Sequence, residues 1–199
     1  MRLGWTKLWR LTSLLAIALA APGLTAGAQN RGANAPTNEL TVAGLRPGVS
    51  TLADAEKRFG TKNRDTQAET DDIKQWGEAC TGRSLRLEVD ERGVIQIVTV
   101  SSLGARAADC ASKAPGNGPL TIERLKSGQG LALGEAKKRV VALYGEPDSV
   151  VPATFEGQEF EMLYYAFDWA GSDVPQVMEV TCERGTGRVR KITLAFPSL

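Results

Sequence analysis

The chain has 199 residues, with 24 Lys and Arg against 23 Asp and Glu, 42% hydrophobic residues and no histidine. This even charge balance gives no support to a nucleic-acid partner, because proteins that bind nucleic acids usually carry a basic stripe. The lack of histidine in the sequence excludes Ser-His-Asp triads, Cys-His pairs and every zinc site that uses imidazole.

The first 28 residues have the pattern of a secretory signal peptide. Three basic residues are followed by an uncharged apolar run and then by Ala26-Gly27-Ala28, so we expect cleavage before Gln29. A retained membrane anchor is the weaker alternative, since the strongly apolar residues 11–21 are fewer than the roughly 20 that a spanning helix needs. Cleavage leaves 21 basic and 23 acidic residues, a net charge of −2. The sequence therefore predicts an exported protein, periplasmic or extracellular, without stable membrane insertion.

Residues 41–112 predict a short helix followed by an antiparallel meander, after a lead-in of residues 29–40 that is predicted to be disordered. Thr51 with Asp54 matches a capping box at the start of the helix, and Gly60 can end it in a left-handed conformation. Apolar and polar residues then alternate, as in strands with one wet face. These strands are expected at residues 73–76, 84–90 and 94–101.

Residues 120–199 predict a second unit of the same kind, after a Gly- and Pro-containing linker at residues 113–119. The stretch 131–147, LALGEAKKRVVALYGEP, resembles residues 45–61 in its entry and in its glycine exit. Pro147 prevents the helix from continuing. A strand or turn is expected at residues 120–128, and strands at residues 161–169, 176–183 and 188–196.

The predicted fold class is α+β, with two tandem repeats that each pack a short helix on an antiparallel meander. Entry, cap and meander agree in order between the two units, which favours duplication over two ordinary helix ends. A unit of this size has a thin core, so stacking two of them buries faces that neither could bury alone.

The three cysteines have no CxxC spacing, which argues against metal and thioredoxin-like sites. In an oxidising compartment a disulfide is expected, and we predict Cys80 with Cys110, since both lie near turn-rich sequence. Closing this loop would stabilise the fold by about 3 to 4 kcal/mol. Cys182 lies on an apolar alternation and is predicted to be a buried structural thiol. The other two connectivities remain open.

The repeated motifs resemble a known family pattern: L-x-x-G, a short helix closed by a glycine, an aromatic strand, and a two-strand ending with V-x-x-I. This pattern is similar to the fold shared by the beta-lactamase inhibitor protein and the small lipoprotein of the outer-membrane barrel-assembly machinery. It covers residues 42–101 and 121–196. The matching positions are Leu45, Gly48, Phe59, Gly60, Trp76, Val94 and Ile97, then Leu131, Gly134, Tyr144, Gly145, Pro147, Tyr165, Val189 and Ile192.

The resemblance implies a helix layer on one face of a curved antiparallel sheet, with the other face available to bind a protein. The inhibitor family uses two such repeats, whereas the assembly lipoprotein uses one repeat and an amino-terminal lipid. This chain departs from the lipoprotein pattern, because it has two predicted repeats and no cysteine near the predicted cleavage position.

The candidate binding residues are aromatic. On a strand, Tyr165 and Phe167 share the predicted core face, whereas Tyr164 and Asp168 share the other face. Tyr and Trp at a rim are typical binding anchors. We therefore predict that the partner-binding residues are Trp76, on a wet face, and Tyr164, Asp168 and Trp169. The sequence provides no motif for a catalytic residue, a metal ligand or a cofactor.

These observations favour an exported, non-enzymatic protein-binding module that works as an envelope assembly factor or an enzyme inhibitor. The alternative is a carboxylate-based hydrolase or small-ligand-binding protein that uses Asp168, Asp173 or Glu159. A third hypothesis is a purely structural envelope protein.

Overall fold

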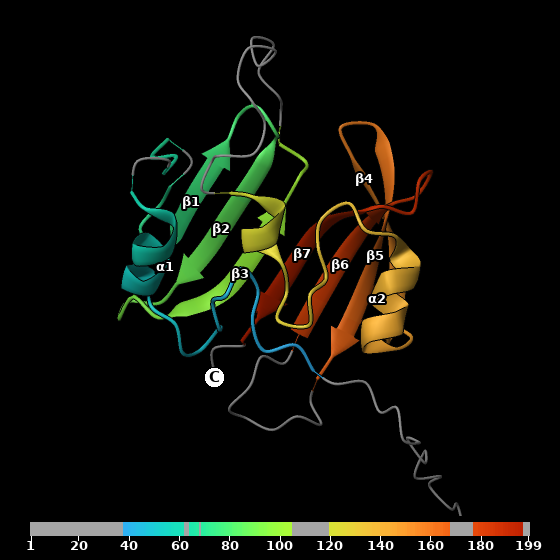
Figure 1. Ribbon diagram of the computed structural model, residues 1–199, viewed down its shortest axis with the longest axis horizontal. Helices are drawn as coiled ribbons and strands as arrows, with labels where there is room; N and C mark the ends of the chain where they lie inside the picture. Colours follow the sequence, from blue (N-terminus) through green and yellow to red (C-terminus); the bar gives the residue numbers. More distant parts are fainter. Residues whose placement is uncertain (1–37, 62–63, 68, 105–119, 168–176, 197–199) are drawn as a thin grey trace, which may run out of the picture. The chain divides into compact units, whose positions relative to one another are not determined.

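The computed structural model describes residues 38–61, 64–67, 69–104, 120–167 and 177–196. It contains one seven-stranded antiparallel sheet with the strand order β1-β2-β3-β7-β6-β5-β4 (Figure 1). Two short α-helices, α1 (Leu52–Phe59) and α2 (Lys137–Tyr144), and the 3-10 helix η2 (Ile122–Leu125) accompany it. The strands are β1 (Ile73–Glu78), β2 (Arg83–Val89), β3 (Ile95–Ser101), β4 (Ser149–Phe155), β5 (Gln158–Ala166), β6 (Val177–Glu183) and β7 (Val189–Ala195).

The predicted fold class, an α+β pair of tandem helix-plus-meander repeats, is wrong. Strands β3 and β7 pair directly, from Ile97 with Ala195 to Ser101 with Lys191, so strands from both predicted repeats form one sheet. All described residues belong to one unit, Asn34–Leu199. Each α-helix has only eight residues, so the fold is mainly β. The physical reason is that β3 and β7 would each be an edge strand in a separate unit, and their pairing satisfies those backbone groups.

Strand β4 was not predicted from the sequence. Its sequence, SVVPATF, contains Pro152, which has no backbone N–H. In a strand with neighbours on both sides, this residue would leave one ladder hydrogen bond unmade. The structure resolves this difficulty because β4 is the last strand of the sheet and pairs with β5. The described part of β4 therefore offers one side of its backbone to β5 and leaves the other side at the sheet edge.

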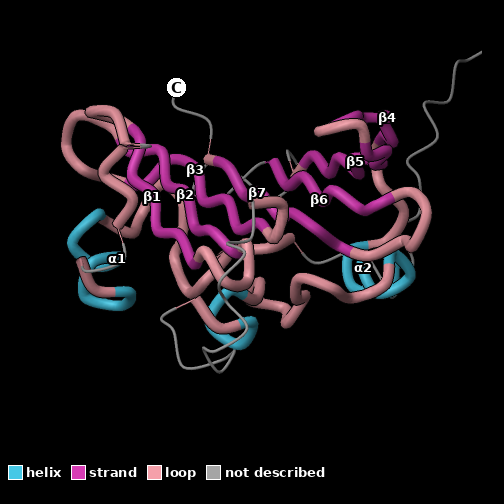
Figure 2. Tube along the Cα trace, turned by 90° about the horizontal axis from the view of Figure 1, so that it is seen from above, coloured by secondary structure: helices cyan, strands magenta, loops and turns pink. Residues whose placement is uncertain are grey.

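One face of the sheet carries the core. Buried residues alternate along the strands, and both α-helices lie on that side of the sheet (Figure 2). Val100, Ile192 and Val180 are neighbours across β3, β7 and β6, and all three are fully buried. We call this side the core face and the opposite side the outer face. Ala55 and Phe59 of α1, Val140 and Tyr144 of α2, and Leu125 of η2 belong to the same core.

The start of α1 and the ends of both α-helices follow capping signals in the sequence. The predicted capping box is confirmed: the hydroxyl of Thr51 accepts a hydrogen bond from the backbone N–H of Asp54, and the Asp54 carboxylate accepts one from the backbone N–H of Thr51. Gly60 and Gly145 follow α1 and α2 with positive φ angles of 74° and 80°. Ala136 precedes α2 and has no hydroxyl or carboxylate to cap it.

The buried carboxylate of Glu39 ties the start of the described chain to the region before α2. One oxygen accepts hydrogen bonds from the backbone N–H groups of Leu40, Thr41 and Gly128. The other accepts hydrogen bonds from the backbone N–H of Gln129 and the hydroxyl of Tyr144. The prediction of a disordered lead-in is therefore wrong at its C-terminal end, and residues 29–37 lie outside the described part.

None of the helices in the described residues has the length and apolar character needed to cross a bilayer.

Candidate functional site

Trp76, predicted on a wet face as a partner-binding residue, is fully buried, so that placement is wrong. It pairs across the sheet with Leu85, which points into the core, and cross-strand partners share a face. Its Nε1 donates a hydrogen bond of 2.6 Å to the carbonyl of Gly60, and its ring lies 6.3 Å from that of Phe59. The guanidinium of Arg64 lies 5.9 Å from the same ring. Trp76 is thus an anchor between α1 and β1.

Tyr164 lies half-buried on the outer face of β5. Leu163 and Tyr165, on either side of it, are buried in the core, so the predicted alternation of this strand is confirmed. Asp168 and Trp169 lie outside the described residues. The partner-binding roles of Tyr164, Asp168 and Trp169 therefore remain predictions.

The structure tests the cysteine predictions for Cys182 but not for the pairing of Cys80 with Cys110. Cys182 is a free thiol on the core face of β6, as expected for a structural cysteine. Burial raises its pKa to about 11, so the thiol is neutral in the folded protein. Cys110 lies outside the described residues, and its pairing with Cys80 remains a prediction.

An apolar patch covers the outer face at the β4 edge of the sheet. Val151 lies opposite Met162, and Ser149 lies opposite Tyr164, so these pairs share the outer face. The exposed fractions of Val151 and Phe155 are 44% and 47%. We name this surface the β4–β5 patch, and it consists of Val151, Phe155, Met162 and Tyr164. Large apolar side chains exposed together on a sheet edge are a typical interaction surface.

The surroundings of the β4–β5 patch are acidic. Four carboxylates near it form no ion pair with another described residue: Glu146, Asp148, Glu156 and Glu179. Of the cations in this region, Arg184 pairs with Glu159, whereas Lys191 lies on the outer face opposite Thr181, in the same cross-strand row as Met162. The border of the patch thus contains more carboxylates than cations.

The carboxylates proposed for hydrolysis do not form a described acid and base pair. Asp168 and Asp173 lie outside the described residues, and exposed Glu159 lies 3.5 Å from Arg184. Glu161, on the same strand, accepts a hydrogen bond from Lys137, which lowers the pKa of its carboxyl. A general acid requires the opposite shift. Among the described residues, no group of three or more Cys, Asp and Glu side chains is placed to hold a metal ion.

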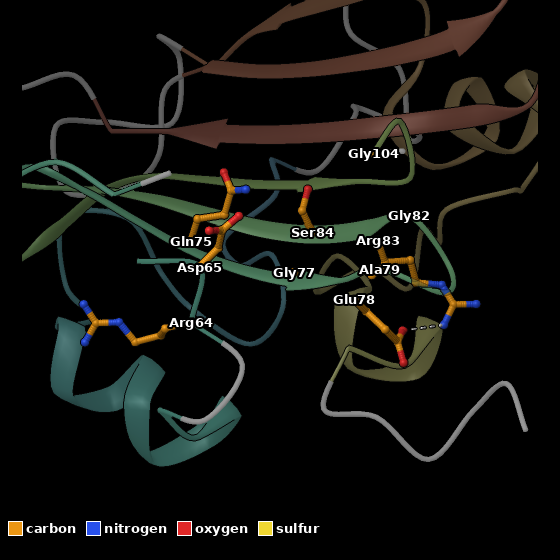
Figure 3. Close-up of a pocket in the computed structure, with 10 residues that line it drawn as sticks. All are labelled: Arg64, Asp65, Gln75, Gly77, Glu78, Ala79, Gly82, Arg83, Ser84 and Gly104. Carbon is orange, nitrogen blue, oxygen red and sulfur yellow. Dashed lines mark ion pairs between the residues drawn. The ribbon is translucent and has the colours of Figure 1, made fainter. Parts of the chain in front are cut away.

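A first cavity, of about 520 Å³, lies beside β1 and β2. Figure 3 shows that its charged side chains do not converge: Arg64 points away toward α1, while Glu78 and Arg83 face each other at the other end. Arg64 is held by Glu69 and Glu56 at 2.7 and 2.6 Å. The hydrogen bond from Arg64 lowers the pKa of Glu69. This cavity therefore presents ion pairs that stabilise the fold.

A second cavity, of about 470 Å³, lies where β2, β3 and β7 approach the segment before α2. Three arginines line it, Arg83, Arg188 and Arg190, and we name it the arginine cavity. Among the described residues that line it, there is no Asp or Glu. The other described lining residues are Cys80, Thr81, Ser102, Ile122, Leu133 and Gly134.

Sequence reasoning missed both β4 and the arginine cavity. A signal for the cavity exists in the alternation: Arg83 precedes Leu85 and Leu87, and Arg190 precedes Ile192 and Leu194, each at spacing two. These arginines therefore continue the core face beyond its apolar part. No local pattern shows that β2 and β7, which are distant in sequence, bring them to one cavity.

Comparisons with known proteins do not assign the chain to a family. No family model matches it, and no curated protein matches its sequence. A DUF4309 family protein, YjgB, from Bacillus subtilis matches with 9% identity and a TM-score of 0.44, over 82% of this chain and 88% of that one. A cysteine-rich secretory protein from Staphylococcus aureus matches with 10% identity and a TM-score of 0.34, over 81% of this chain and 47% of that one. Scores this low carry no argument about fold or function.

Proposed function

We propose that this protein is an exported binding module that recognises an extended segment of another protein at the β4–β5 patch. The observation that supports this most directly is the exposure of β4, which is solvent-exposed at all seven positions although Val150, Val151 and Phe155 are large and apolar. An exposed apolar edge strand promotes association unless it is protected. Its persistence in this chain is best explained by a partner that covers it.

The proposed mode of binding is strand addition. In the described part of the chain, β4 pairs with β5 alone, and its other edge is available to a partner strand except at Pro152, which has no N–H to donate. Main-chain hydrogen bonds along such an edge supply affinity, and alternate side chains supply specificity. Val151 and Phe155 alternate on the outer face beside Tyr164, so they would contact every second side chain of the partner. This proposal retains Tyr164 as a partner-binding residue.

The carboxylates around the β4–β5 patch indicate which charges the partner segment carries. The unpaired carboxylates around the β4–β5 patch favour a segment with basic side chains on either side of its apolar positions. Electrostatic attraction of this kind raises the association rate and weakens as salt screens it. We therefore propose an apolar partner segment with flanking Lys or Arg residues.

Export is part of the proposal and is supported by the basic, apolar and small-residue order of residues 1–28. In the cell envelope such a module would act as an assembly factor or as an enzyme inhibitor. The resemblance to the beta-lactamase inhibitor and assembly-lipoprotein families supports these two roles, and binding in place of catalysis is proposed with them.

Capture experiments with charge-introducing variants test this function. The full chain, expressed with its N-terminal segment and purified from the exported fraction, is compared with Val151→Lys and Phe155→Lys after crosslinking. We expect a partner that is lost in both variants, and slowed hydrogen exchange of the β4 amides in the purified complex. Val49→Lys is the matched control, because Val49 is 58% exposed and lies before α1. A partner retained by both patch variants, or lost equally in the control, would overturn the proposal.

A further inference from the structure

The arginine cavity carries a chemistry that the proposed protein-binding function does not use. Arg83 donates to the carbonyl of Leu120 at 3.3 Å, Arg188 to that of Gly134 at 3.0 Å, and Arg190 to that of Ser102 at 3.0 Å. These backbone contacts fix the position of each guanidinium. Since a guanidinium has five N–H donors, each arginine keeps most of its donors for another acceptor.

Ion pairing leaves the positive charge of the cavity incompletely balanced. The closest carboxylate oxygen lies 3.8 Å from Arg83, on Glu78, and 3.7 Å from Arg190, on Glu183. Both distances are longer than a hydrogen bond. Arg188 forms no ion pair with a described residue. The side chains of Arg83 and Arg190 are only 19% and 28% exposed, so water screens their charges poorly.

A buried donor in Arg190 points to a missing acceptor. Its Nε is shielded from solvent and has no hydrogen-bond partner among the described residues. An unsatisfied buried N–H destabilises a folded protein. Because Nε is shielded from solvent, an oxygen of a ligand in the cavity would reach it only after the Arg190 side chain turns toward the cavity.

We propose that the arginine cavity binds an oxyanion, the phosphate or carboxylate group of a small acidic molecule. The guanidinium fork matches the geometry of both groups. The hydroxyls of Thr81 and Ser102 also line the cavity, but they donate to Glu78 and to the carbonyl of Arg190, so the arginines are the donors for the anion. Ile122 and Leu133 form an apolar part of the wall, which suits the carbon skeleton of an organic anion. The site lies at β2, β3 and β7, whereas the β4–β5 patch lies at the β4 edge, so the inference is independent of the proposed function.

Calorimetric titration of the full exported chain with inorganic phosphate, and separately with citrate, tests the proposal at constant ionic strength. We expect saturable binding of at least one of the two anions. Binding of phosphate alone identifies a phosphate ligand, and binding of citrate alone identifies a carboxylate ligand. No saturable binding of either anion would overturn the proposal.

Variants locate the site. Arg188→Gln should weaken binding about tenfold or more, since it removes a charge-assisted donor. Arg188 is exposed and holds a single backbone carbonyl, so this variant should retain its melting temperature. Arg92→Gln is the matched control, because Arg92 is 81% exposed and pairs with Asp90 in a turn outside the cavity. Equal loss in both variants would show unspecific ion binding and overturn the proposal.

A second measurement is independent of folding in the variants. Addition of the bound anion to the wild-type protein should shift the NMR amide signals of Ser102 and Gly134, while the signal of Arg92 stays in place. Shifts spread evenly over the chain would contradict a site in the arginine cavity.

Discussion

At the scale of single residues, Glu39 is the polar side chain on which the most local structure depends. Its carboxylate accepts five hydrogen bonds, four from backbone N–H groups and one from Tyr144. Glu39→Gln keeps the shape of the side chain but places an amide NH2 group against N–H and O–H donors that point at a carboxylate oxygen in the wild-type protein. Because hydrogen bonds to a charged group contribute about 1.5 to 3 kcal/mol, we expect a loss of about 2 to 3 kcal/mol in the free energy of unfolding.

Urea unfolding of the Glu39→Gln protein measures this loss. Glu123→Gln serves as the matched control, since the Glu123 side chain is 75% exposed and pairs only with Lys126 among the described residues. The control should change the free energy of unfolding by no more than about 0.5 kcal/mol. If the two variants lose the same amount, Glu39 does not hold the segments together.

The thiol of Cys182 should react only when the protein unfolds. Burial raises its pKa to about 11 from an ordinary value of 9.0. A raised pKa means that the neutral thiol contributes its full stability below pH 9.0, and that this contribution is lost as the pH rises toward 11. We therefore expect stability to decline in this alkaline range, and expect Cys182→Ser, which removes the thiol, to make the decline shallower.

Alkylation at neutral pH, followed by mass spectrometry, checks the predicted protection of the Cys182 thiol. The folded protein should resist modification of Cys182, and urea should expose it. Adding reductant in urea should expose two more thiols if Cys80 and Cys110 are paired as predicted. Modification of Cys182 in the folded protein would contradict its burial.

The sequence predicted side-chain placement where alternation alone decides it. Tyr165 and Phe167 are buried as expected, because β5 is paired on both sides and Phe167 continues its alternation just beyond Ala166. Trp76 was misplaced because its face depends on the chain after α1, where Gly60 and Arg64 cover it. The contacts of Trp76 with Gly60 and Arg64 join β1 to the segment after α1. The alternation within β1 alone does not predict them.

At the scale of secondary-structure elements, the capping box of α1 should be measurable. Thr51→Ala removes the hydroxyl that caps the helix, and such a change costs about 1 kcal/mol. Hydrogen bonds from the backbone N–H and the hydroxyl of Thr51 lower the pKa of Asp54 from 3.8. A lowered pKa means that the stabilisation is present above pH 3.8 and lost as the pH falls through the folded value.

A double-mutant cycle with Asp54→Asn checks this prediction by thermal unfolding at neutral and acidic pH. The two effects should be less than additive, since both side chains belong to one hydrogen-bonded pair. The penalty of Asp54→Asn should shrink in acid, where the wild-type carboxyl is itself protonated. Strictly additive penalties that do not depend on pH would contradict the capping box.

Most elements could be predicted because their signals are local. The start of α1 and the ends of both α-helices have a geometric cause in the sequence, and six of the seven strands were expected from it. Strand β4 could not be predicted in this way, because Pro152 is acceptable only at a sheet edge. Whether a strand lies at an edge is a property of the whole sheet. The β4–β5 patch could not be predicted for the same reason, because it consists of side chains from β4 and β5 that only the assembled sheet brings together.

At the scale of the whole molecule, the pairing of β3 with β7 is the feature that sequence patterns do not encode. The two strands are separated by most of the second half of the chain, and each has the same alternation that it would have in a separate meander. Pairing removes two edges and joins the apolar rows of Val100 and Ile192 into one core. A fold of this kind should unfold as one unit.

Ile192→Ala tests that expectation at the junction. Ile192 is fully buried between Val100 of β3 and Val180 of β6, and such a truncation costs about 2 to 5 kcal/mol. Because the core is continuous, amides of β2 and β6 should lose hydrogen-exchange protection by the same free energy, and urea unfolding should remain a single transition. Val150→Ala, at an exposed position of β4, should change neither quantity by more than about 0.5 kcal/mol. If β2 keeps its protection while β6 loses it, the halves are energetically separate and the single core does not govern stability.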